Sequence, residues 1–260
     1  MSSPASVAEQ LAHLGVRPGS VLVVHSAFSR VGPMEGGPDG LVAALEIVLG
    51  PQGTLVMPSM TEDDDHVFDP RATPCRHLGV VPDRFWRHPG VLRGDTPHAF
   101  AAKGPAAAEI VRPQPVDIPH GPDSPVGRVH QMDGWVLLIG VGHDANTTIH
   151  LAEALAEVPY RLPKHATVLR DGRPETVRYL EIDHCCQRFA LADQWMDAGR
   201  CQRRGWVGKA EARLMRSRDL VDVVVSHLRQ DPLLFLHPPG VDAECDQARQ
   251  SCAHGPAGAA

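Results

Sequence analysis

The residues best suited to chemistry lie where an apolar segment gives way to a helix. Trp135 to Gly140 is a short apolar run typical of a buried strand, and Asn146 or Thr147 can cap the helix that follows. His150 then falls in the first helical turn, three residues before Glu153 on the same face. The positive potential of a helix N-terminus disfavours imidazolium, so this histidine could stay neutral and accept a proton. The same pattern also fits a core histidine bonded to a backbone carbonyl.

Two groups of carboxylates are candidates for binding a cation or orienting a histidine. Glu181 and Asp183 lie two residues apart at the end of a strand-like segment, so they should project to the same side. They could orient an imidazole, hold an ammonium group, or form a solvated strand edge. The acidic run at 62–65, which includes Asp64, is typical of a solvated loop and could instead line a pocket for a polycation.

Two loops add further candidates. His120 lies in a proline-rich loop at 119–125, whose restricted backbone suits the positioning of a side chain. The turn from His25 to Ser29 leaves a buried strand, the place where open α/β sheets bind ligands, although a plain turn has the same composition. No phosphate loop and no dinucleotide-binding glycine motif follows a strand.

The elements that must position these residues alternate along the chain. Apolar runs predict strands at 20–25, 54–58 and 135–140, a hairpin at 166–170 and 175–181 around Asp171-Gly172, and helices at 7–14, 41–49, 187–196 and 220–228. Such alternation favours a largely parallel or mixed central sheet with helices on both faces, a three-layer α/β/α fold.

One domain is expected over residues 1–252, followed by a flexible tail at 253–260. From about 59 to 125 prolines recur and the apolar periodicity weakens, so this excursion should be mostly irregular. An irregular segment that follows the carboxyl end of a strand is typical of a substrate-binding region.

Composition excludes several classes of protein. The 260 residues are 43% hydrophobic and 22% charged, with no apolar run long enough for a membrane span. The formal charge of −6 argues against nucleic-acid binding and is compatible with a cationic ligand. The first residues lack a signal-type segment, so a cytoplasmic location is expected. A monomer and a homodimer both remain open.

The six cysteines show no disulfide-like spacing, and reduced thiols are expected. Cysteines and histidines do recur near residue 185 and near the end of the chain, and a structural zinc ion is one interpretation. Its ligands would come from His184, Cys186 and Cys245, and Cys185, His237 and Cys252 could also supply ligands. The spacing matches no known zinc finger, and ordinary thiols are the alternative.

Four segments together resemble the aminoglycoside 3-N-acetyltransferase family, and they occur in the family's order: Val23 to Phe28, Gly53 to Ser59, Asp123 to Val126, and Gly140 to Glu153. Four more narrow the resemblance to the apramycin-acetylating type: Phe68 to Pro70, Leu180 to Cys186, Phe189 to Asp193, and Phe235 to Pro239. The match covers nearly the whole chain. One departure is Thr96-Pro97, where family members commonly carry a His-Pro pair.

The resemblance implies transfer of an acetyl group from acetyl-CoA to the 3-amino group of a 2-deoxystreptamine antibiotic such as apramycin, gentamicin or tobramycin, and hence resistance. It also implies a fold distinct from that of the most widespread small N-acetyltransferases. On this basis His150 would be the catalytic histidine, and Glu181 and Asp183 would lie near it or near the drug, with His120 in the same cleft. The residues expected near the CoA arm are Ser26, Ala27, Phe28, Ser29 and Ser124.

The chemistry of the reactants suggests a mechanism. An aminoglycoside amine is mostly protonated at neutral pH and must lose a proton before it attacks a thioester, so a base is needed. His150 is the candidate, with Glu181 orienting its imidazole and Glu153 as an alternative partner that could simply face solvent. Backbone amides of the turn after His25 could stabilise the thioester oxygen.

Direct transfer needs no cysteine nucleophile, and nothing in the sequence marks Cys185 or Cys186 as an activated thiolate. Asp64 and Asp183 would attract the polycationic drug. The rival functions are acetylation of another small amine, zinc-dependent hydrolysis, and antibiotic binding without catalysis.

Overall fold

The centre of the protein is a seven-stranded sheet in the order β3-β4-β2-β1-β5-β9-β8, seen in a computed structural model that describes residues 1–61 and 66–252. Its middle strands are parallel: β2 (Thr54–Pro58), β1 (Val21–Ser26) and β5 (Trp135–Ile139). The flanking strands are antiparallel: β3 (Leu92–Arg93), β4 (Phe100–Lys103), β9 (Ala210–Arg216) and β8 (Gln202–Val207). The sheet is therefore mixed.

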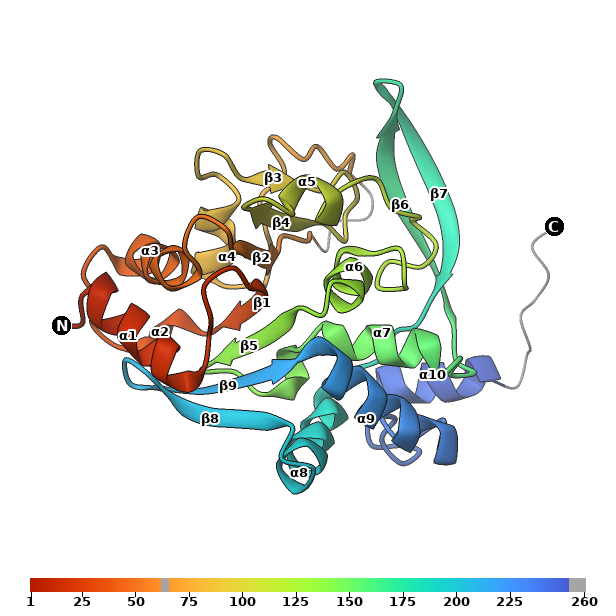
Figure 1. Cartoon of the computed structure of the whole chain (residues 1–260). Coiled ribbons are helices and arrows are strands. Elements are labelled where there is room, and N and C mark those ends of the chain that lie inside the picture. Colours follow the sequence, from red (N-terminus) through yellow and green to blue (C-terminus); the bar gives the residue numbers. More distant parts are fainter. Residues whose placement is uncertain (62–65, 253–260) are drawn as a thin grey trace.

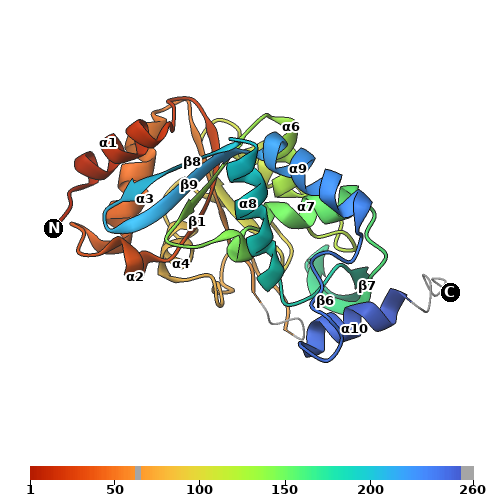
Figure 2. The same cartoon turned by 90° about the horizontal axis from the view of Figure 1, so that it is seen from below.

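Helices cover both faces of this sheet (Figures 1 and 2). Leu22 and Val24 of β1 pack with α1 (Pro4–Leu14), α3 (Gly37–Leu49) and α4 (Val80–Phe85). Val23, between them, packs on the opposite side with α6 (Pro125–Gln131), α7 (Thr148–Leu155) and α9 (Ser217–Gln230). The alternation of β1 side chains separates two cores, and the predicted three-layer α/β/α fold is confirmed.

The excursion at 59–125 is more regular than expected, because it contains β3, β4, α4 and α5 (Ala107–Ile110). Strand β4 extends the sheet by pairing with β2 from Leu55 opposite Lys103 to Pro58 opposite Phe100. Its sequence is short and alanine-rich, so neither periodicity nor β-propensity marks it as a strand. The carboxyl end of β2 is thereby covered on one side.

The predicted hairpin is confirmed and longer than expected: β6 (Leu162–Arg170) pairs with β7 (Arg173–Glu181). Asp171 and Gly172 both have positive φ, as the Asp-Gly turn predicts. The hairpin stands apart from the main sheet, with α10 (Ala243–Cys252) near its base (Figure 1). Its last residue, Glu181, is therefore brought toward α7.

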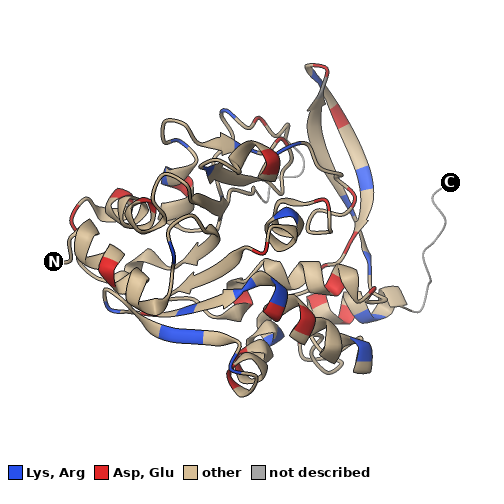
Figure 3. Ribbon diagram, viewed as in Figure 1, with Lys and Arg blue, Asp and Glu red and all other residues tan. Residues whose placement is uncertain are grey.

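Short elements complete the chain: α2 (Phe28–Val31), the 3-10 turns η1 (His143–Ala145) and η2 (Gln187–Ala190), and α8 (Leu191–Ala198). Within the described residues, no helix combines the length and apolarity needed to cross a membrane. Positively and negatively charged residues are interspersed along the ribbon (Figure 3).

Candidate active site

His150 lies in the first turn of α7, where the sequence places it. Asn146 caps this turn, because its side-chain oxygen accepts a hydrogen bond from the Thr148 amide at 3.2 Å. The Asn146 amide group also donates to Nδ1 of buried His143. The segment between β5 and α7 is thus fixed by buried side-chain hydrogen bonds.

Glu153, three residues later, is the hub of the site. Its fully buried carboxylate accepts hydrogen bonds from His150 Nδ1 at 2.7 Å, His184 Nε2 at 2.8 Å and the Tyr160 hydroxyl at 2.6 Å. Burial acts to raise the pKa of this carboxyl, but the two histidines outweigh it and lower the pKa to about 2. Glu153 is therefore a buried anion with three donors.

The expectation that Glu181 orients His150 is wrong, because Glu153 occupies that position. The i, i+3 spacing brings the Glu153 carboxylate to Nδ1 directly. Glu181 instead contacts His98, whose Nε2 lies 3.2 Å from Oε1. Burial acts to raise the pKa of Glu181, but the contact with His98 lowers it overall.

His150 does not behave as its helical position alone predicts. Burial would lower its pKa, but the Cys186 sulfur and the Glu153 carboxylate raise the pKa well above 6.5, which favours the imidazolium more than the helix N-terminus alone predicts. Since Nδ1 donates to Glu153, the proton-accepting lone pair of the neutral ring is on Nε2. That nitrogen lies 3.5 Å from the Cys186 sulfur.

A cavity of about 160 Å³ lies beside His150. Its lining includes Asp117, His120, Arg161 and Glu181. The ring of His120 stacks on that of His150 with centroids 5.3 Å apart. Burial, assisted by the neighbouring histidines, lowers the pKa of His120 well below 6.5, so this imidazole is neutral. The structure thus brings three predicted residues, His120, His150 and Glu181, around one cavity.

Two predicted drug-binding carboxylates are placed differently. Asp183 lies beyond the end of β7 and forms an ion pair with Lys164 at 2.5 Å. It does not line the cavity beside His150. Asp64 and the acidic run around it lie outside the described residues.

A second cavity, of about 550 Å³, lies at the carboxyl ends of β1 and β2. The predicted CoA-binding residues Ser26, Ala27, Phe28 and Ser29 all line it. His25 lines it as well; burial, with a smaller effect of His143, lowers its pKa to about 4. Within this turn the Ala27 amide donates to the Ile139 carbonyl, so this one amide is not free to stabilise a thioester oxygen.

Ser124 is misplaced in the predicted CoA set. Its hydroxyl is fully buried and accepts a hydrogen bond from the Gly127 amide, so it caps α6. It lines neither of the two cavities. The Ser-Pro sequence that marks a helix start explains why the motif is there.

The predicted zinc ligands His184, Cys186 and Cys245 do not form a common site, and this prediction is wrong. Both ring nitrogens of His184 are engaged, with Nε2 on Glu153 and Nδ1 accepting from the Cys186 amide. The Cys186 sulfur faces His150 and the His184 carbonyl. The sulfur of Cys245 lies 3.6 Å from that of Cys185 instead.

Sequence reasoning missed three residues of the site: His98, Tyr160 and the active-site role of His184. His98 directly follows the Thr96-Pro97 pair. In the family's His-Pro pair the histidine precedes the proline, whereas in this chain a histidine follows it. His184 lies two residues from Cys186, and only its contact with Glu153 reveals its role. Tyr160 carries no sequence signal.

The fold and the site define an α/β enzyme in which a buried histidine and carboxylate pair adjoins a cavity, an arrangement suited to proton transfer. A family model described as aminoglycoside 3-N-acetyltransferase matches residues 23–229. The chain belongs to the aminoglycoside 3-N-acetyltransferase family, and it is an acetyltransferase.

Individual relatives agree with this assignment. The chain is 57% identical to aminoglycoside N(3)-acetyltransferase IV of Salmonella sp over 90% of both chains. It is 56% identical to the solved apoenzyme of AAC(3)-IVa, with a TM-score of 0.93 over 96% of this chain and 97% of that one.

Two further structures contain ligands. An AAC(3)-IVa mutant with a histidine replaced by alanine was solved in complex with apramycin; it is 53% identical, with a TM-score of 0.88 over 94% of this chain and 98% of that one. AAC-IIIb was solved as a binary complex with CoASH; it is 27% identical, with a TM-score of 0.81 over 88% and 97% of the two chains.

Proposed function

We propose that this enzyme acetylates the 3-amino group of 2-deoxystreptamine aminoglycosides, including apramycin and gentamicin, with acetyl-CoA as the donor, and so confers resistance. The observation that carries the proposal is the buried pair of His150 and Glu153 beside a cavity. The resemblance to the apramycin-bound relative supports the drug class, and the CoASH complex supports the donor.

His150 acts as the general base. Its Nε2 accepts a proton from the 3-ammonium group, directly or through water, and the amine nitrogen then attacks the thioester carbon. The carbon–sulfur bond breaks and CoA leaves as the thiolate, which takes the proton of the imidazolium. The nitrogen loses its second proton to solvent as the amide forms. Glu153 stabilises the imidazolium, which accords with the raised pKa of His150.

The two cavities divide the substrates. We place the CoA arm against Ser26 to Ser29 in the larger cavity, and the reacting amino sugar beside His150 and Glu181 in the smaller one. About 160 Å³ is less than a typical ligand pocket of ~300–1,000 Å³, so the smaller cavity fits only part of a drug. We propose that the two cavities connect, since His25, which lines the larger one, is among the groups that lower the pKa of His120, which lines the smaller one.

The remaining contacts are proposed on charge. Glu181, with its lowered pKa, is an anion in the cavity wall and suits an ammonium group of the drug. We propose that Asp64 and Asp183 attract the polycationic drug. We further propose that residues 1–252 act as one catalytic domain and that the reaction occurs in the cytoplasm, where acetyl-CoA is available.

The test is release of CoA thiol when the purified chain meets acetyl-CoA with apramycin or gentamicin. Nuclear magnetic resonance of the product should locate the acetyl group on the 3-amino nitrogen. His150→Ala should lower turnover about 100-fold or more, the scale expected for loss of a general base. His13→Ala, an exposed histidine on α1, is the control and should match the wild type. Thiol release with none of the aminoglycosides would overturn the proposal.

A further inference from the structure

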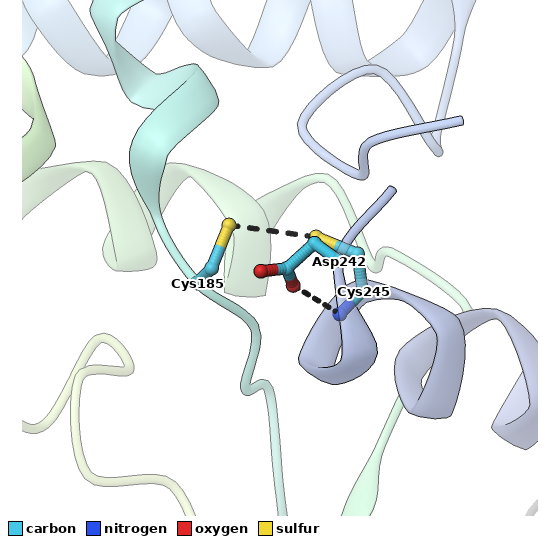
Figure 4. Close-up of side chains that lie close together, drawn as sticks. All are labelled: Cys185, Asp242 and Cys245. Carbon is cyan, nitrogen blue, oxygen red and sulfur yellow. Dashed lines mark hydrogen bonds between the residues drawn. The ribbon is translucent and has the colours of Figure 1, made fainter. Parts of the chain in front are cut away.

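Cys185, Asp242 and Cys245 bring two sulfurs and a carboxylate together where the loop after β7 meets the start of α10 (Figure 4). Their ligand atoms all lie within 4.8 Å of one another. Among the residues that the structure describes, no other group of three His, Cys, Asp or Glu side chains meets this condition. Cys185 and Cys245 are among the cysteines that the sequence suggests as zinc ligands, whereas Asp242 is not.

The spacing of the two sulfurs fits a pair of metal ligands. The sulfurs of Cys185 and Cys245 are 3.6 Å apart. A disulfide needs about 2.05 Å, whereas two thiolates on one tetrahedral zinc, each about 2.3 Å from the ion, lie about 3.8 Å apart. Cys245 is fully buried and Cys185 half-buried, as ligands of a structural ion are.

The carboxylate is held in place by the backbone. One oxygen of Asp242 accepts a hydrogen bond from the Cys245 amide at 2.9 Å, which fixes the side chain at the start of α10. Its other oxygen is then oriented beside the sulfurs (Figure 4). Aspartate oxygens bind zinc at about 2.0–2.2 Å, so a small shift of these side chains onto one ion suffices.

His237 supplies an independent indication of a missing partner. Its Nε2 is buried, and the described structure offers it no hydrogen-bond partner. Its ring nitrogens are not among the atoms that lie within 4.8 Å of one another, so the ring must move to reach an ion held by the trio. A buried ring nitrogen without a partner is unfavourable, and a tetrahedral structural site needs a fourth ligand.

We propose that the chain binds one structural zinc ion through Cys185, Asp242 and Cys245, with His237 as the fourth ligand. All four positions are then taken by protein, so the ion is structural and does not take part in the acetyl transfer. It joins α10 to the loop that carries His184, one residue before Cys185, and His184 donates to Glu153. The ion therefore positions the buried hub of the active site from outside it.

Metal content tests the proposal. Chain purified without chelator should contain close to one zinc ion per molecule by mass spectrometry of the metal. Cys245→Ser and Asp242→Ala should each lower the zinc content about tenfold or more, because a structural site depends on every ligand. Cys201→Ser is the matched control, since that thiol lies outside the cluster, and it should keep its zinc.

Cobalt substitution checks the ligands without relying on the variants folding. The wild-type chain, loaded with cobalt after removal of its zinc, should show a sulfur-to-cobalt charge-transfer band of the intensity expected for two thiolates. Absence of this band, a wild-type chain that takes up no zinc from a zinc salt, or zinc retained in full by Cys245→Ser would each overturn the site. A Cys185–Cys245 disulfide in freshly purified chain would also overturn it.

Discussion

Replacing Glu153 with glutamine should be the most revealing single change in the active site. The two oxygens of the carboxylate have different partners: Oε1 accepts from His184 and Tyr160, and Oε2 accepts from His150. An amide has one oxygen, and two donors hold it at the Oε1 position. The NH₂ group then faces Nδ1 of His150.

This replacement inverts the tautomer of His150. A donor facing Nδ1 requires that nitrogen to accept, so the ring proton moves to Nε2 and the lone pair needed for catalysis is lost. Loss of one charge-assisted hydrogen bond alone is worth about 1.5–3 kcal/mol, or about 10- to 150-fold in rate. The wrong tautomer costs about 10⁴-fold in the serine protease triad. We therefore expect kcat of Glu153→Gln to fall about 10³- to 10⁴-fold.

The assay is CoA thiol release with saturating acetyl-CoA and drug, with Glu157→Gln as the control. Glu157 is exposed just beyond the end of α7 and should tolerate the same change. Far-ultraviolet circular dichroism and thermal melting should show that both variants are folded. A Glu153→Gln enzyme with kcat within about tenfold of the wild type would refute the reasoning, because tautomer control would then contribute little.

The pH profile gives a second measure of the same pair. The wild-type rate should fall as pH drops through the pKa of His150, which lies well above 6.5, because imidazolium cannot accept a proton. In Glu153→Ala one of the two groups that raise the pKa of His150 is gone, while Cys186 and the burial of the ring remain, so the acidic limb should move to lower pH. Protonation of the drug amine is common to both enzymes and cancels in the comparison. If the acidic limb of the pH–rate profile stayed at the same pH in Glu153→Ala, the limb would report the titration of a group other than His150.

Three other changes have distinct expected outcomes. Cys186→Ala should keep kcat within about tenfold, and mass spectrometry of wild-type enzyme mixed with acetyl-CoA alone should find no acetylated cysteine; a covalent adduct would replace direct transfer by a two-step reaction. Glu181→Gln should raise the KM for the drug and leave that for acetyl-CoA unchanged, since this carboxylate lines only the smaller cavity. An equal rise in the KM for the drug and in the KM for acetyl-CoA would contradict the assignment of the two substrates to separate cavities. His25→Asn should remove part of the acid sensitivity of folding. The pKa of His25 is about 4 in the folded chain and near 6.5 unfolded, so the unfolded state gains a proton first as pH falls. Between pH 6.5 and 4 the free energy of unfolding of the wild type should fall by up to about 3 kcal/mol, and His25→Asn should not show this loss. Denaturant unfolding of both proteins across this pH range measures the difference.

The sequence predicts the parts of the fold that are strongly periodic. The middle strands β1, β2 and β5 are buried on both faces and read as continuous apolar runs. The antiparallel pair β8 and β9 was missed, because arginines and a glycine interrupt it and its outer side is solvated. Edge strands are selected by tertiary pairing, which local composition does not record.

In the candidate site, too, the sequence predicts what is local and misses what depends on tertiary contacts. His150 stands out because a strand, a cap and a helix are adjacent in the sequence, and the structure keeps them together. The choice between Glu153 and Glu181 as its partner could not be made, because it depends on where a distant hairpin ends. Glu153 is tolerated in the core only because Tyr160, seven residues further along the chain, and His184, 31 residues further, complete its hydrogen bonds.

A site rich in histidine presents a problem for a polycationic drug, because protonated imidazoles would repel it. His25 and His120 line the two cavities and have no carboxylate on their rings in the described structure, so burial lowers the pKa of each. His150 is equally buried, yet the Cys186 sulfur and the Glu153 carboxylate raise its pKa. These two groups thus make one imidazole basic while His25 and His120 stay neutral. The proton of the reacting amine therefore has a single favourable acceptor, and the surrounding rings do not oppose the approach of a cation.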